Sequence, residues 1–241
     1  MKKNDLQKVG LVIFSKTPGR NPAKTRIANQ SDALLAEQVH LALFHNTLKL
    51  ARSLSDLFTL YGCPAENDLA VTASDDWLGF ECILTESVTL KDRVLEVINQ
   101  LIPIHGSVII IGTDCPDLDK MDLINALNFV MRGSSVIGPS YDGGFYLLAL
   151  SDLVSKQRWD QIEWSSSKTC QGVTRCLGHL SPMNLDTKQD IDTLDDLKMY
   201  LARLSRKPHI DLESHLKKAL EGFNVRSQNL ETNHNRYICS P

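Results

Sequence analysis

The sequence lacks the features that would place the chain in a membrane or on a nucleic acid. None of its apolar runs approaches the roughly 18–20 residues that a membrane span needs. Its net charge of −3 gives no basic surplus for binding an anionic polymer. The first apolar run, VGLVIF at 9–14, is also too short for the core of a signal peptide. We therefore expect a cytoplasmic protein with no membrane span and no nucleic-acid partner.

Cysteine is present, but never in the pattern of a metal or redox site. The cysteines include no C-x-x-C pair and no histidine at matching spacing, which argues against zinc and thioredoxin-type chemistry. They stand at positions 63, 82, 115, 170, 176 and 239. In a reducing cytosol we expect free thiols, several of them filling the core.

The segment PGRNPAKTR, residues 18–26, has some features of a phosphate-binding P-loop, because a glycine and a Lys-Thr pair follow an apolar run. The spacing excludes that motif. Ala23 stands where the second glycine is needed, and Pro22 removes an N–H from the phosphate cradle. Four cations nearby can still clamp a diphosphate through charge-assisted hydrogen bonds, although a solvated basic loop remains the alternative. These cations are Lys16, Arg20, Lys24 and Arg26.

Apolar runs typical of strands alternate with helical periodicity along the chain. Strands are predicted at 9–14, 57–61, 69–73, 107–112, 134–138 and 145–150. Helices are predicted at 31–54, 90–102, 121–131, 167–178 and 193–205. This alternation predicts an α/β fold with a mostly parallel central sheet flanked by helices. We expect one domain over 1–205 and a polar extension over 206–241, with a helix at 213–223 and a loose tail after it.

An acidic pair follows the most strongly apolar predicted strand, SVIIIG at 107–112. Its β-branched residues indicate a central strand that delivers Asp114 to the carboxyl edge of the sheet, where α/β proteins bind ligands. Mg²⁺ takes one or two protein carboxylates and fills its octahedron with water and phosphate oxygens. Asp114 is therefore a candidate metal ligand, while Asp117 could merely cap the next helix, for which Asp119 is also a plausible N-cap.

Two further acidic segments have a structural and a functional interpretation each. Asp142 lies in PSYDGG, where the glycines allow a ligand to approach the backbone but also fit an ordinary hairpin turn. In DTKQDIDTLDDL, Asp192 or Thr193 is a good N-cap for the last predicted helix, with Asp195 and Asp196 complementing the helix dipole. That interpretation leaves Asp190 without a role.

Five segments taken in order carry a resemblance to a known family. They are FSKTPGRNPAKTRIA, IGTDCPDL, GPSYDGGFYLLAL, IEWSS and DIDTLDDL, which lie within residues 9–203. In this order they resemble a bacterial family of GT-A-type nucleotide-diphospho-sugar transferases, formerly a domain of unknown function. That family includes an arsenosugar-biosynthesis-type branch and is similar to phospholactate and molybdenum-cofactor guanylyltransferases. One segment departs from the family pattern: VTLKDRV at 88–94 stands where the family has a glycine-bearing GDLGERM-like stretch.

The resemblance implies a three-layer Rossmann-like GT-A fold that binds an NTP or NDP-sugar and a small-molecule acceptor with Mg²⁺ or Mn²⁺. The residues implied to bind the nucleotide or its phosphates are Lys16, Gly19, Lys24, Thr25, Arg26 and Arg93. Asp114 and Asp142 are implied as catalytic residues, and Asp114, Asp190 and Asp192 as metal ligands. Gly143, Gly144 and Ser165 would line the acceptor or sugar pocket.

These observations favour a Mg²⁺-dependent transferase, with glycosyl transfer preferred over nucleotidyl transfer. Two alternatives come from particular segments. DIDTL at 190–194 spells the D-x-D of a HAD-type phosphatase, although it follows no long apolar strand near the start of the fold. The altered 88–94 segment would suit a non-catalytic nucleotide-binding protein. The sequence leaves the sugar, the base, the acceptor and the oligomeric state open.

Overall fold

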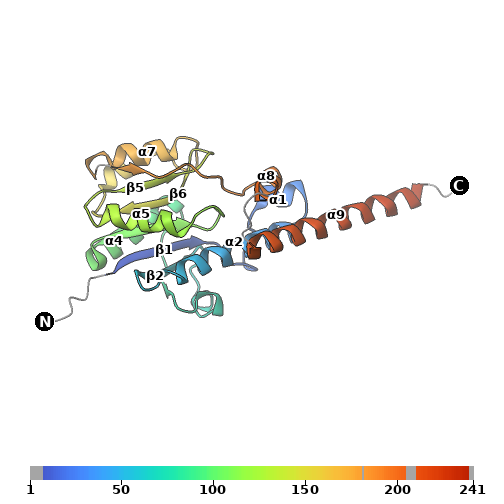
Figure 1. The fold of residues 1–241 in the computed structure, drawn as a ribbon, viewed down its shortest axis with the longest axis horizontal. Coiled ribbons are helices and arrows are strands. Elements are labelled where there is room, and N and C mark those ends of the chain that lie inside the picture. Colours follow the sequence, from blue (N-terminus) through green and yellow to red (C-terminus); the bar gives the residue numbers. More distant parts are fainter. Residues whose placement is uncertain (1–7, 181, 205–209, 239–241) are drawn as a thin grey trace. The chain divides into compact units, whose positions relative to one another are not determined.

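The computed structural model describes residues 8–180, 182–204 and 210–238, which divide into two compact units (Figure 1). Unit 1 is made of the described parts of Met1–Thr17 and Thr47–Asp190. Unit 2 is made of the described parts of Pro18–Asn46 and Ile191–Pro241. The boundary expected near residue 205 lies outside the described residues, and the division found here follows a different pattern, because the segment 18–46 joins the C-terminal helices.

Unit 1 is built on one seven-stranded sheet with the order β3-β2-β1-β4-β6-β5-β7. The strands are β1 (Val9–Ser15), β2 (Phe58–Pro64), β3 (Glu81–Cys82), β4 (Val108–Gly112), β5 (Val136–Pro139), β6 (Phe145–Leu150) and β7 (Met183–Asn184). Every pairing is parallel except those of β6, which runs antiparallel to both β4 and β5. The expected α/β class with a mostly parallel sheet is confirmed.

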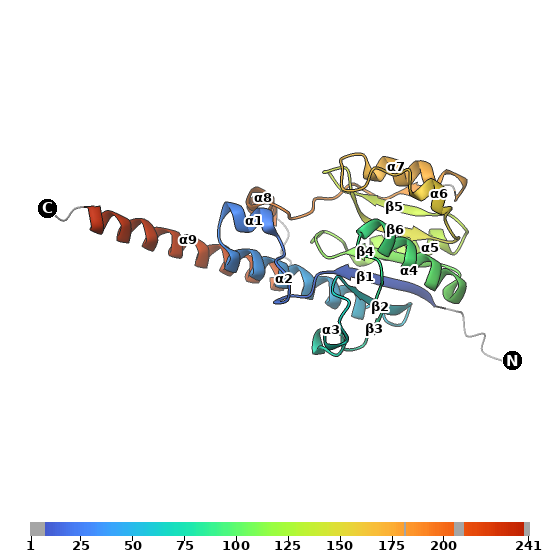
Figure 2. The same cartoon turned by 180° about the vertical axis from the view of Figure 1, so that it is seen from behind.

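Helices cover both faces of this sheet, which gives unit 1 three layers (Figures 1 and 2). The helices are α3 (Leu69–Thr72), α4 (Leu90–His105), α5 (Lys120–Val130), α6 (Lys156–Trp159) and α7 (Thr169–Cys176), with single 3₁₀ turns at Asp75–Trp77 and Gly178–Leu180. One core cluster joins α4 and α7 to alternate residues of the strands, such as Val12, Ile110 and Leu148. Because successive strand residues point to opposite faces, their neighbours Leu11, Ile109 and Leu147 are buried on the other face, where α5 contacts β4, β5 and β6.

Unit 2 consists of helices packed around a separate core. They are α1 (Thr25–Gln30), the first part of α2 (Ala33–Arg52), α8 (Leu194–Leu204) and α9 (Ile210–Ile238). Their core contains Leu35, Val39, Leu43, Leu197 and Leu216, all with no exposed surface. The i, i+4 spacing of Leu35, Val39 and Leu43 is the amphipathic pattern that lets α2 bury one face.

Two of the secondary-structure predictions are wrong. LAVTA at 69–73 is not a strand, because Asp68 accepts a hydrogen bond from the Ala70 N–H at 2.8 Å and starts the four-residue helix α3. The segment 224–238 is not a loose tail, because α9 continues to Ile238. After Gly222 this stretch contains no glycine or proline that would break a helix.

Two other expectations concern cysteines and membranes. The cysteines at 63, 82, 115, 170 and 176 are free, as expected, and Cys239 lies outside the described residues. Within the part of the chain that the structure describes, no helix has both the length and the apolar character to cross a membrane.

Candidate nucleotide and metal site

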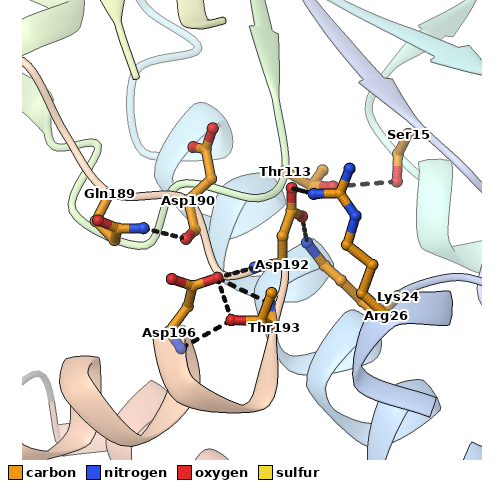
Figure 3. A network of polar contacts seen from close by, with 9 residues as sticks. All are labelled: Ser15, Lys24, Arg26, Thr113, Gln189, Asp190, Asp192, Thr193 and Asp196. Carbon is orange, nitrogen blue, oxygen red and sulfur yellow. Dashed lines mark hydrogen bonds and ion pairs between the residues drawn. The ribbon is translucent and has the colours of Figure 1, made fainter. Parts of the chain in front are cut away.

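The site begins at the carboxyl ends of β1 and β4, which are neighbours in the sheet. Their register pairs Phe14 with Gly112, so the residues that follow, Lys16 and Asp114, leave the sheet at the same edge. The Ser15 and Thr113 hydroxyls lie 3.4 Å apart there (Figure 3). The chain order reverses between these two strands, since β2 lies on one side of β1 and β4 on the other. Open α/β sheets bind their ligands at such a switch point.

The segment after β7 returns to the same edge, because β7 is parallel to β5. Lys188 donates a hydrogen bond to the Asp117 carbonyl oxygen at 3.0 Å and forms a 2.9 Å ion pair with Asp122. Burial raises the pKa of the Cys115 thiol, and the nearby carboxylates of Asp190 and Asp117 raise that pKa further. The Lys188 backbone also pairs with Pro139 and Tyr141 at the end of β5, so Asp190, two residues further on, lies at this edge as well.

This set of donors suits a hard cation that needs few protein ligands. Across the described ranges, no group of three or more His, Cys, Asp or Glu side chains is arranged to hold a metal ion. Asp114 and Asp190 belong to unit 1, whereas Asp192 belongs to unit 2. One or two carboxylates are sufficient for Mg²⁺, which keeps several waters and takes the rest of its shell from substrate phosphates. Carboxylate oxygens without histidine or cysteine ligands favour Mg²⁺ or Mn²⁺ over zinc.

In unit 2, the implied phosphate-binding cations are paired with an implied metal ligand. The Lys24 ammonium lies 2.9 Å from the Asp192 carboxylate, and the Arg26 guanidinium approaches the same carboxylate at 3.8 Å (Figure 3). The Lys24 side chain is only 4% exposed, whereas that of Arg26 is 71% exposed. The Arg26 guanidinium is thus accessible to an anionic ligand. The Lys24 ammonium is buried against Asp192, so an anion would have to compete with that carboxylate for it.

The segment around these cations has an unusual backbone. Lys24 precedes α1 and has a φ of 50°, and Ser165 has a φ of 56°. They are the two non-glycine residues with positive φ in the described chain, and both were singled out from the sequence. Non-glycine residues in this conformation carry strain that the surroundings must offset, and such residues concentrate at functional sites.

Two further residues implied to bind the nucleotide lie in the same segment as Lys24. Thr25 is exposed at the start of α1, and the Gly19 N–H donates to the Glu37 carboxylate at 2.7 Å.

The start of α8 explains the other acidic residues of its segment. The Thr193 hydroxyl accepts a hydrogen bond from the Asp196 N–H at 3.1 Å, and Asp196 in turn accepts from the Thr193 N–H at 2.8 Å. These reciprocal bonds form a capping box, so the expected N-cap is Thr193. Asp192 is left to pair with Lys24 and Arg26. For the phosphatase alternative, the preceding strand β7 has two residues and lies at the edge of the sheet.

The turn between β5 and β6 is the hairpin that the DGG sequence allowed. Asp142 is exposed, and one of its carboxylate oxygens accepts the Gly144 N–H at 2.8 Å. Gly143 has a φ of 88°, and a Cβ there would lie 2.0 Å from the Ser167 carbonyl oxygen. Gly143 is therefore required by the packing of the turn itself, whether or not a ligand approaches it.

We expect Gly143→Ala to destabilise unit 1 while Gly144→Ala does not. The left-handed backbone alone costs an alanine about 1–3 kcal/mol, and the clash with Ser167 adds to this. At Gly144 the nearest atom to an added Cβ is an Asp142 carboxylate oxygen at 3.1 Å, on a side chain that can move. Thermal unfolding of the two variants checks this, and an unchanged midpoint for Gly143→Ala would show that the turn does not need the glycine.

Arg93 is buried at the carboxyl end of β2 and contacts neutral groups. It donates to the Pro64 carbonyl oxygen at 2.6 Å and the Thr85 hydroxyl at 2.8 Å, and its guanidinium lies 5.3 Å from the centre of the Phe14 ring. It also contacts the Cys63 sulfur at 3.3 Å. Burial raises the pKa of the Cys63 thiol to about 11, although Arg93 opposes this shift. Arg93 thus ties the end of β2 to α4, with its positive charge close to β1.

An apolar cavity of about 180 Å³ lies below this edge on the face covered by α4. Its walls include Phe14, Val94, Ile110, Phe145 and Trp164. Of the three residues implied to line an acceptor pocket, Ser165 lines this cavity, whereas Gly143 and Gly144 are not among its walls.

Several contributors to this edge carried no signal in the sequence. Lys188 and Asp122 pair across 66 residues, and neither lies in a recognisable motif. The apolar walls are ordinary core residues whose convergence depends on the tertiary fold. A paired arrangement of polar residues far apart in the chain could have been found only from residues that vary together among relatives.

Comparisons with known proteins agree with this fold. The family model described as "Uncharacterized protein conserved in bacteria (DUF2064)" matches residues 54–166, which confirms the resemblance stated from the motifs. The match includes Arg93, Asp114, Asp142 and Ser165, and it stops short of the cations near residue 24 and the acidic segment near residue 190. No curated protein matches the sequence.

Solved structures with similar folds have low sequence identity to this chain. A candidate nucleotide-diphospho-sugar transferase of Desulfovibrio desulfuricans G20 has a TM-score of 0.75 at 21% identity, covering 87% of this chain and 94% of that one. A 4-diphosphocytidyl-2C-methyl-D-erythritol synthase of Anaerococcus prevotii has a TM-score of 0.54 at 11% identity, covering 84% and 98%. A cytidylyltransferase of Leptospira borgpetersenii has a TM-score of 0.53 at 12% identity, covering 92% and 96%. These likenesses establish the Rossmann-like fold.

Proposed function

We propose that this protein is a transferase that acts on a nucleotide-activated donor, and that it transfers a glycosyl group from an NDP-sugar to a small acceptor. The observation that carries the proposal is the placement of Lys16, Asp114 and Asp190 along the carboxyl edge of unit 1, with Lys16 and Asp114 at the β1–β4 switch point. The same fold occurs in a candidate nucleotide-diphospho-sugar transferase, which supports the choice of donor.

Asp114 and Asp190 are the residues that would hold Mg²⁺ or Mn²⁺ in unit 1. When bound, the ion would neutralise charge that develops on the leaving diphosphate. Lys16 is exposed at the end of β1, next in register to Asp114, and would bind the phosphates directly. In unit 2, Arg26 is exposed, and an anionic ligand would compete with Asp192 for it and for Lys24.

Glycosyl transfer joins the acceptor oxygen to the anomeric carbon of the sugar. The bond between that carbon and the diphosphate oxygen breaks, and the nucleoside diphosphate leaves with the electron pair. The acceptor hydroxyl loses its proton in the same step. Asp142 is an exposed carboxylate at the same edge of unit 1, with one oxygen bound to the Gly144 N–H, and we assign it as the proton acceptor.

Nucleotidyl transfer is the second candidate, because two cytidylyltransferase structures share the fold at TM-scores of 0.54 and 0.53. In that reaction a phosphorylated acceptor attacks the α-phosphorus of an NTP, and pyrophosphate leaves. The products distinguish the two reactions: glycosyl transfer releases a nucleoside diphosphate, whereas nucleotidyl transfer releases pyrophosphate.

We expect NDP-sugars of one base to raise the unfolding midpoint only when Mg²⁺ or Mn²⁺ is present. A thermal-shift panel of NTPs and NDP-sugars, each with and without the metal, measures this. A ligand at a hundred times its dissociation constant contributes about 2.7 kcal/mol of stability. A shift with NTPs alone would favour nucleotidyl transfer, and no shift across the panel would contradict the proposal.

A further inference from the structure

We infer that the apolar cavity of unit 1 binds a single aromatic ring of the acceptor, and that Gly112 keeps the space for that ring open. That the ring belongs to the acceptor rests on the proposed function, whereas the ring-binding site itself is argued from the cavity alone. The cavity starts directly beneath the edge that carries Asp114, because Gly112 is one of its walls.

The size of the cavity limits the ligand. Its volume is about 180 Å³. An apolar cavity of about 150 Å³ lined by leucine, isoleucine and phenylalanine is known to stay dry and to admit benzene. The cavity of this protein therefore has room for one six-membered ring.

The chemistry of the walls favours an aromatic group over a sugar. Phe14, Phe145 and Trp164 supply ring surfaces, and the Phe145 and Trp164 rings meet edge to face with their centres 6.0 Å apart. Val94 and Ile110 complete the apolar lining. Aromatic pairs in offset or edge-to-face contact gain about 0.5–1.5 kcal/mol beyond their area. A sugar ring in the same space would lose the hydration of most of its hydroxyls, because the residues with hydroxyl groups among the walls are few: Tyr146, Ser165 and Thr169.

The mouth of the cavity lies at the altered segment 88–94. Leu90 is 51% exposed and Val88 is 95% exposed, and Leu90 is a wall of the cavity. Ser165 is exposed and is also a wall, so the cavity reaches the surface between these residues. An apolar mouth suits an apolar ring.

Gly112 is the residue that sets the depth of the cavity. It is the last residue of β4 and its φ is not in the left-handed region, so the backbone does not require glycine. A Cβ built there meets no atom within 4 Å. By strand alternation it would point to the face of Ile110, which lines the cavity. Glycine within a strand often marks a place where a ligand approaches closely.

The experiment measures binding of 4-fluorobenzyl alcohol to the full chain by ¹⁹F NMR, without nucleotide or metal. We expect saturable broadening of the ¹⁹F line, reversed by excess benzyl alcohol. Gly112→Val fills the cavity and should weaken binding at least tenfold without lowering the unfolding midpoint. Gly178→Val is the matched control, because a Cβ there also meets nothing within 4 Å and Gly178 is not a wall.

Two results would overturn the inference: wild-type protein that does not bind the fluorinated alcohol saturably, or Gly112→Val that binds it as wild type does. If Gly112→Val does not fold, Leu90→Asp replaces it, since Leu90 is half-exposed at the first turn of α4 and should also weaken binding at least tenfold. The nucleotide panel separates this failure from failure of the proposed function. Nucleotide binding without ring binding overturns the cavity assignment alone, and ring binding without nucleotide binding overturns the transferase alone.

Discussion

Replacing Asp122 by asparagine should destabilise the protein by about 2–3 kcal/mol, because it removes one charge of a mostly buried, hydrogen-bonded ion pair. The Lys188 and Asp122 side chains are only 16% and 13% exposed, and they lie 2.9 Å apart. Asparagine keeps the shape of aspartate, so the change removes charge and little packing. For a chain of this size the loss corresponds to about 4–12 °C in the unfolding midpoint, measured by thermal unfolding.

Asp92→Asn is the matched control, because Asp92 lies three residues after the N-cap residue of its helix, Thr89, as Asp122 lies three residues after Asp119. The Asp92 N–H donates to the Thr89 hydroxyl at 3.2 Å, and its carboxylate accepts from that hydroxyl at 2.6 Å. Its ion pair with Lys91 is at the surface, with 28% and 37% of the two side chains exposed. Exposed pairs contribute about 0–1 kcal/mol. Equal losses in the two variants would contradict the assignment of the larger loss to the buried pair.

The pH dependence gives a second test of the same pair. Burial alone would lower the pKa of Lys188, but the hydrogen bond and charge of Asp122 outweigh burial and raise the pKa. A raised lysine pKa contributes stability that is complete below the unfolded value, about 10.4, and is lost as the pH rises through the folded value. The stability difference between wild type and Asp122→Asn should therefore be constant near neutral pH and shrink above about pH 10.4.

The sequence predicted those parts of the fold that depend on local patterns. The β-branched run 107–112 became the central strand β4, and Asp119 became an N-cap, accepting the Met121 N–H at 2.7 Å. These features need only periodicity and a short polar side chain at a helix start. The strand predicted for LAVTA at 69–73 is wrong because so short a run, four apolar residues and a threonine, fits a strand or a helix equally well, and Asp68 decides for the helix.

The site was predicted less completely, because pairing over long distances in the chain is not a local property. Lys24 and Asp192 were assigned to different ligands from their motifs, yet they form an ion pair across 168 residues. The DGG turn allowed a hairpin or a ligand contact. The antiparallel pairing of β5 with β6 shows the hairpin, which the two-residue signal could not decide alone. The apolar cavity has no sequence signature, because it is a gap in the packing of ordinary core residues that come together only in the tertiary fold.

Replacing Asp114 by asparagine should remove the metal dependence of nucleotide binding and leave the fold intact. Asp114 follows the end of β4 by two residues and is only half-buried, so asparagine fits its position. A carboxylate that holds Mg²⁺ strengthens nucleotide binding when the ion is present. Without the ion, the same carboxylate repels the phosphates. The variant should therefore bind nucleotide more weakly than wild type with Mg²⁺, and as well as or better than wild type without it.

This reversal of sign separates a metal ligand from a residue that only supports the fold, because general damage weakens binding under both conditions. If affinity with Mg²⁺ falls about a hundredfold, the ligand stabilisation at a fixed concentration of a hundred times the wild-type dissociation constant drops from about 2.7 to about 0.4 kcal/mol. Asp56→Asn is the control, since Asp56 is exposed on unit 1 and lies away from the carboxyl edge, just before β2. A Mg²⁺-dependent shift that survives in Asp114→Asn would exclude Asp114 as the metal ligand, and it would leave Asp190 as the carboxylate to test next. Loss of the dependence with the control unaffected would make the β4 edge the metal site, and it would exclude a scaffold that keeps the fold without metal-dependent binding.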